Sequence, residues 1–129
     1  MGEQVFTIRQ HPAMRATMTP LGGRHGAAVV DDDHLTVRYG VGFHARIPRS
    51  SLGPPEHYEG KVASWGVHGW RGRWLVNGSS HGMVVVPVDP PQRARVLGWP
   101  ISLRQLTISL DDPEGFMAAL VARPLPSPP

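Results

Sequence analysis

The stretch that decides the fold reads QLTISLDDPEGFMAALVA and runs from Gln105 to Ala122. Apolar and polar residues alternate from Leu106 to Leu110, which is the period-two pattern of a strand with one face on a core and one in water. Asp112 is a favourable helix N-cap, and Pro113 suits the first helical position, where a missing N–H costs nothing. The stretch therefore predicts a strand followed at once by a helix.

The predicted helix covers Gly115 to Ala122 and is short, because Pro124 ends the run. Its apolar side chains recur at spacings that place them on one face of a helix. They are Phe116, Met117, Leu120 and Val121. A mainly β protein closed by one C-terminal helix is the architecture that this segment predicts.

The clearest hairpin pattern lies between His34 and Ile47. Alternation continues on both sides of Gly40-Val41-Gly42, and a three-residue loop fixes which residues face each other. The predicted cross-strand pairs are Tyr39 with Phe43 on the buried side, and Arg38 with His44 and Thr36 with Arg46 on the outer side. The outer face of this hairpin is therefore expected to be basic.

Shorter strand patterns flank the hairpin, at 5–10, 27–30, 82–88 and 93–97. Prolines are expected to break the chain at Asp89-Pro90-Pro91, and Gly98-Trp99-Pro100 is expected to be a turn. The valine-rich run 82–88 is typical of a strand that lies centrally or is covered on both faces. The segment 65–76 contains several glycines and aromatic residues, and a turn is expected after it at 77–80. This arrangement predicts a second hairpin.

About seven short strands must cover their apolar faces and protect their edges, which favours a curved sheet pair or partly open barrel plugged by the helix. We expect one domain over residues 1–123, with 27–123 best supported. The pattern leaves open whether the first 26 residues join the sheet. The proline-rich tail, 124–129, is expected to be disordered.

Composition narrows the possible functions of this 129-residue chain. There is no cysteine, so a disulfide-held secreted protein, a catalytic thiol and a thiolate metal site are not expected. The sequence shows no long apolar run and no signal-peptide pattern at its start, so we expect a cytoplasmic protein without a transmembrane segment. Twelve Arg and one Lys give a net charge of +3, which either favours a polyanionic partner or reflects a GC-rich genome.

Four motifs resemble the bacterial pleckstrin-homology-like (PH-like) domains, in the same order along the chain. They are HLTVRYG (34–40), RIPRSSL (46–52), GRWLVNG (72–78) and LTISLDDPEGFMAAL (106–120). The resemblance covers about residues 27–123 and implies two near-orthogonal antiparallel sheets closed by a C-terminal helix. It also implies a binding module, by analogy of fold. The lipid site of phosphoinositide-binding members is not carried over, because the loop at 40–42 holds no cation.

No catalytic or cofactor-binding constellation is predicted. The seven histidines show no helical i, i+4 pair, and the best local cluster, His34 beside Asp31-Asp32-Asp33, is typical of a solvated turn. Ser79-Ser80-His81 is interpreted as a turn, since adjacent strand residues point to opposite faces. We therefore predict no enzyme activity, no cofactor and no metal site, and a small hydrolase or metal-dependent enzyme is the least favoured reading.

The candidate partner-binding residues lie in the segment Trp70-Arg71-Gly72-Arg73-Trp74 and on the outer face of the first hairpin. Trp74 is expected to pack inside and to leave its neighbours near the surface. The candidate residues are Trp70, Arg71, Arg73, Arg38, His44 and Arg46. We predict a non-catalytic module that binds a protein or peptide or that self-associates as a homo-oligomer. The alternative is binding of nucleic acid or anionic lipid through the Arg and Trp side chains.

Overall fold

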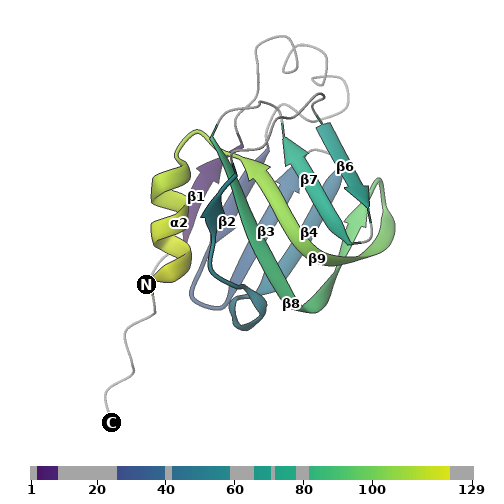
Figure 1. The fold of residues 1–129 in the computed structure, drawn as a ribbon, viewed down its shortest axis with the longest axis horizontal. Helices are drawn as coiled ribbons and strands as arrows, with labels where there is room; N and C mark the ends of the chain where they lie inside the picture. The colour runs from purple at the N-terminus through teal and green to yellow at the C-terminus, as the bar shows by residue number, and fades with distance from the viewer. Residues whose placement is uncertain are drawn as a thin grey trace.

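The computed structural model describes residues 3–8, 26–39, 42–58, 66–70, 72–77 and 82–122, with only the backbone described for 66–70 and for Asn77. These segments hold nine strands, a 3₁₀ turn and one α-helix (Figure 1). The elements are β1 (Gln4–Thr7), β2 (Ala27–Val30), β3 (His34–Tyr39), β4 (Phe43–Pro48), η3 (Arg49–Ser51), β5 (Glu56–His57), β6 (Gly66–Trp70), β7 (Arg73–Asn77), β8 (Met83–Val96), β9 (Trp99–Ser109) and α2 (Pro113–Val121).

The strands form one open sheet in the order β1-β2-β3-β4-β8-β9-β7-β6, with β5 paired to β8 as well. In Figure 1, β1 to β4 form a back layer, and β8, β9, β7 and β6 cross in front of it. The predicted mainly β architecture with an open sheet and one C-terminal helix is confirmed. Residues 4–7 join the sheet as β1, whereas residues 9–25 lie outside the described part of the chain.

The first hairpin has the predicted register. Tyr39 pairs with Phe43, and both side chains are buried because they face the core. On the other side of the strands the predicted pairs Arg38 with His44 and Thr36 with Arg46 are also present. Strict alternation over two strands left only one register that buries the whole apolar set.

The strands β8 and β9 carry the chain between the two layers and bend where their register shifts, between Pro87 and Gln92. The expected break at Asp89-Pro90-Pro91 is wrong, because β8 continues through it from Met83 to Val96. Prolines are tolerated at such an irregularity, where ladder hydrogen bonds are already lost. The expected turn at Gly98-Trp99-Pro100 also lies too late: the turn is Leu97-Gly98, and β9 begins at Trp99.

The second hairpin differs from the prediction. Instead of pairing with β8, β7 pairs with β6 and runs parallel to β9. The expectation of wholly antiparallel sheets is therefore wrong for this pair. Between β7 and β8 lies β9, a neighbour that local alternation cannot reveal. The prediction that the valine run is central is confirmed, because Val84 and Val85 pair with both β5 and β9.

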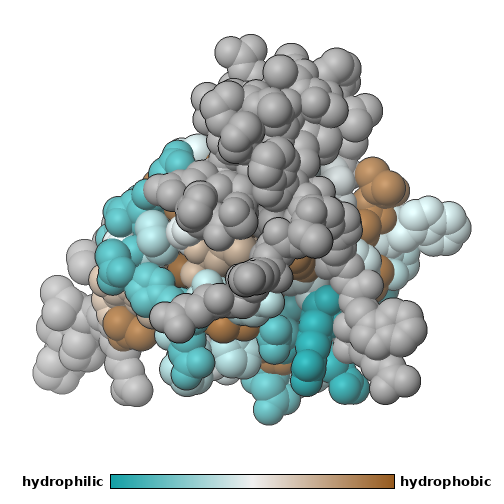
Figure 2. Space-filling view, turned by 45° about the horizontal axis from the view of Figure 1, so that its top comes forward, coloured by the Kyte–Doolittle hydropathy of each residue, from teal (hydrophilic) through white to brown (hydrophobic). Residues whose placement is uncertain are grey.

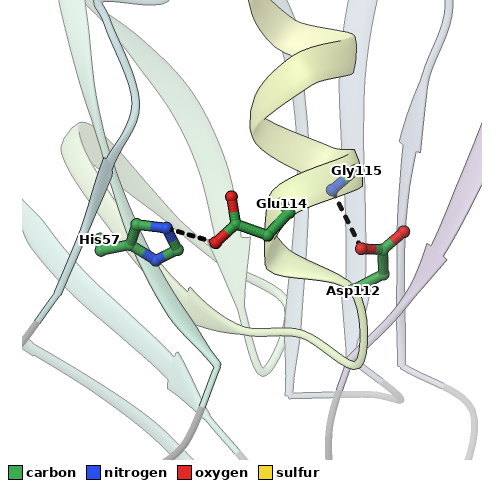
Figure 3. Close-up of polar contacts among 4 residues, drawn as sticks. All are labelled: His57, Asp112, Glu114 and Gly115. Carbon is green, nitrogen blue, oxygen red and sulfur yellow. Dashed lines mark hydrogen bonds and ion pairs between the residues drawn. The ribbon is translucent and has the colours of Figure 1, made fainter.

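The C-terminal helix begins as predicted. The side chain of Asp112 accepts a hydrogen bond from the backbone N–H of Gly115 at 3.0 Å, and His57 on β5 pairs with Glu114 at 2.8 Å (Figure 3). Phe116 is fully buried, but Val121 is 63% exposed and Ala119 is buried in its place. The predicted apolar face is thus wrong at Val121, since position 119, three residues after 116, shares its face. Among the described residues, no helix is long and apolar enough to cross a membrane.

Candidate functional site

The outer face of the first hairpin is basic, as predicted. Arg38 on β3 and its partner His44 on β4 are both exposed, and Arg46 follows two positions further along β4. Their side chains point away from the core because their neighbours in the chain, such as Val37 and Ala45, are buried. These three predicted site residues therefore lie together on one solvated surface.

The strand β8 adds two arginines to this surface. His44 pairs with Arg95, and the same register places Arg93 next to Arg46. Both arginines are exposed, while Ala94 between them is buried. We call the resulting surface the basic face; it consists of Arg38, His44, Arg46, Arg93 and Arg95.

Sequence reasoning missed the contribution of β8. The alternation Arg93-Ala94-Arg95 was visible and gives two outward arginines on a strand with a buried alanine. What the pattern could not supply is the pairing of β8 with β4, since about fifty residues separate Ala45 from its partner Ala94. The charge of the hairpin alone therefore understated the size of the surface.

The strand segments that carry the basic face hold no acidic residue. Neither 34–48 nor 93–104 contains an Asp or a Glu. Neighbouring strands lie about 4.8 Å apart, so the guanidinium groups of Arg46 and Arg93 on β4 and β8 repel one another unless an anion binds between them. Strand pairing thus concentrates positive charge that the modest net charge of the chain does not reveal.

Asp31, at the turn before β3, lies close enough to Arg46 to interact with its charge. Its carboxylate accepts hydrogen bonds from the backbone N–H groups of Asp33 at 2.8 Å and His34 at 2.7 Å. These two bonds hold the pKa of Asp31 below its usual range, and the positive charges of His34 and Arg46 add to the effect. The carboxylate therefore stabilises the turn before β3 through these two hydrogen bonds. No group of three potential metal ligands occurs among the described residues.

A shallow hollow of about 500 Å³ opens at one end of the basic face. Arg93 and Ser102, which pair across β8 and β9, offer a guanidinium and a hydroxyl to it. The amide of Gln92, also on its wall, donates to the Ser51 hydroxyl at 3.0 Å. The remaining lining residues are Pro91, Pro100 and Ile101. With the guanidinium of Arg93 and the hydroxyl of Ser102 as donors and no carboxylate among the lining residues, the hollow suits a small oxyanion such as a phosphate group.

The other predicted site residues lie apart from the basic face. Arg73 is exposed at the start of β7, and β8 and β9 stand between β7 and β4 in the sheet. Trp74 is partly buried and packs against the core, as predicted. Trp70 belongs to β6, but its side chain and the whole of Arg71 fall outside the described residues, as does Ser79-Ser80-His81. The structure thus brings together Arg38, His44 and Arg46. It places Arg73 elsewhere in the sheet.

Comparisons with known proteins do not place the chain in a family. No protein-family model matches the sequence, and searches of curated proteins and of solved structures gave no match. The resemblance to PH-like domains therefore stays a prediction.

Proposed function

We propose that this protein is a non-catalytic cytoplasmic module that binds a phosphate-bearing polyanion on its basic face. The observation that carries the proposal is the row Arg38, His44 and Arg95, which are paired across β3, β4 and β8, with the guanidinium groups of Arg46 and Arg93 beside it. A patch of this kind attracts anionic partners and raises their rate of association.

The arrangement also costs stability in the free protein. Like charges that face one another across strands are destabilising. Phosphate groups relieve this repulsion, and each guanidinium can bind two phosphate oxygens at once. The hollow beside Arg93 and Ser102 supports the same partner chemistry, because these two side chains are donors suited to an oxyanion.

Salt dependence tests the proposal. Binding of a fluorescent single-stranded RNA and of anionic vesicles should be measured from about 50 to 200 mM salt, over which roughly five phosphate contacts predict an affinity loss on the order of a hundredfold. Arg93→Glu should abolish most of the binding. Binding that is absent for both probes, or that does not respond to salt, would contradict the proposal.

Two variants serve as controls. Arg93→Lys keeps the charge and should retain most of the affinity. Arg73→Glu changes the net charge by the same amount as Arg93→Glu but lies on β7, so it should change binding little. If Arg73→Glu weakened binding as much as Arg93→Glu, net charge rather than the basic face would be responsible.

A further inference from the structure

The turn between β8 and β9 exposes two large apolar side chains. Leu97 is 69% exposed and Trp99 is 75% exposed, which makes them the most exposed large hydrophobic residues in the described part of the chain. Figure 2 shows hydrophobic surface at the right-hand edge of the molecule, on the side where the β8–β9 turn lies in Figure 1. Single exposed apolar residues are common, but two within three positions on one tip are a local apolar feature.

Leu97 occupies a backbone conformation that disfavours it. Its φ is 50°, and Gly98 follows with a φ of 84°, so both central residues of this two-residue turn have positive φ. Such a turn favours Asn or Gly at the first position and Gly at the second. A leucine there is strained and also solvated, so neither local conformation nor burial accounts for it.

The tip is held firmly against the end of the first hairpin. The backbone N–H of Leu97 donates to the carbonyl of Gly42 at 3.1 Å, and Arg95 donates through its guanidinium to the carbonyl of Gly98 at 3.1 Å. The pair His44 and Arg95 lies one step behind the turn. A preorganised apolar tip therefore lies at the end of the strand that carries Arg93 and Arg95.

We propose that the Leu97–Trp99 tip inserts into the interfacial region of an anionic lipid membrane while the basic face binds the lipid head groups. This inference rests on the proposed function and selects one source of phosphate. Trp favours the boundary between head groups and acyl chains, and Leu favours the apolar side of it. Anionic lipids supply the negative charge that the arginines behind the tip complement.

A nucleic acid fits the tip less well than a membrane. Leu97 offers neither a π face nor a hydrogen-bonding side chain to a base. Trp99 pairs with Val96, whose side chain packs against the core, so it leaves the strand on the opposite side from Arg95. A stacking platform needs its aromatic side chains in the same groove as the phosphate-binding cations.

The test uses vesicle flotation with the full chain and compares phosphatidylcholine vesicles with vesicles that contain phosphatidylglycerol. The wild type should bind only the anionic vesicles. Leu97→Asn should weaken that binding about tenfold, the loss expected for withdrawing one leucine side chain from an apolar environment. Its thermal midpoint should be unchanged or higher, because Asn suits the turn, so the weaker binding cannot come from unfolding.

Fluorescence locates the tip directly. Brominated lipids should quench the tryptophan emission of the wild type, and Trp99→Phe should remove most of that quenching. Unaltered vesicle binding by Leu97→Asn, or unchanged quenching in Trp99→Phe, would overturn the insertion.

The two proposals fail in different ways. If Arg93→Glu abolished vesicle binding while Leu97→Asn left it unaltered, the basic face would stand and the insertion would be wrong. Salt-sensitive binding of RNA without any binding of anionic vesicles would likewise support the basic face and contradict the insertion. Absence of binding to both RNA and vesicles would overturn both proposals.

Discussion

The guanidinium of Arg49 joins segments that are far apart in the sequence. It donates to the carbonyl of Asp31 at 3.0 Å, and to those of Ala119 and Leu120 at 3.0 Å each. It also donates to the carbonyl of Ala122. The last carbonyls of a helix have no partner within the helix, and a cation near them also interacts favourably with the helix dipole. This one side chain therefore ties the end of α2 to the turn before β3.

Arg49→Ala should destabilise the protein by about 2 kcal/mol, because hydrogen bonds from a charged donor are lost and carbonyls at the helix end are left without it. Urea unfolding measures the change. Arg49→Lys should lose less, since it keeps the charge but not the planar fork that reaches several carbonyls. An alanine variant as stable as the wild type would show that these bonds only replace bonds to water.

The sequence predicted the roles of those single residues that belong to local patterns. The N-cap Asp112 and the outward Arg38 and Arg46 were predictable because each is determined by residues within a few positions. The role of Arg49 was not predictable. Its acceptors include Ala119 and Leu120, about seventy residues later in the chain.

Among the elements, α2 is the one most clearly encoded. Its start combines the Asp112 cap with Pro113 and with Glu114 in the first turn. The pair between Glu114 and His57 then connects this start to β5. The helix is thus fixed at its first turn by its own sequence and at its far end by Arg49.

Asp112→Ala should cost about 1 kcal/mol, since the backbone N–H of Gly115 loses its acceptor. Thermal or urea unfolding reports the loss. Asp112→Asn keeps an acceptor oxygen and should retain most of the stability. If Asn destabilised the protein as much as Ala, the charge near the helix start rather than the capping bond would explain the effect.

The strand predictions succeeded where a turn joins neighbouring strands and failed where strands from distant segments meet. The β3–β4 pair follows from alternation around one short loop. The parallel pairing of β7 with β9 does not, because β9 begins more than twenty residues after β7 ends. Local breaker signals also misplaced the β8–β9 turn, since a strand in a bent sheet tolerates Pro90, Pro91 and Pro100.

For the whole molecule, the contact between the first strand and the last helix closes the fold. Phe116 packs its ring edge-to-face against Phe6, with ring centres 5.5 Å apart and an interplanar angle of 79°. Phe116 is fully buried and Phe6 is 8% exposed. The contact joins the two ends of the described chain over one core.

Phe116→Ala should destabilise the protein by about 3 to 5 kcal/mol, because it removes a buried ring and leaves a cavity. That is a large part of the stability of a domain of this size. The control Val121→Ala alters an exposed residue at the end of the same helix and should change stability by no more than about 0.5 kcal/mol. Equal losses in the two variants would contradict the observed orientation of α2.

The sequence by itself determined the elements that depend on residues close together: the first hairpin with its register, the capped helix and the mainly β character. Only the tertiary structure decided that β8 pairs with β4 and that β9 lies between β8 and β7. The basic face depends on the first of these pairings. Alternation fixes which side of a strand is buried but carries no information about which distant strand lies beside it, because that choice depends on how the whole sheet bends to cover one core.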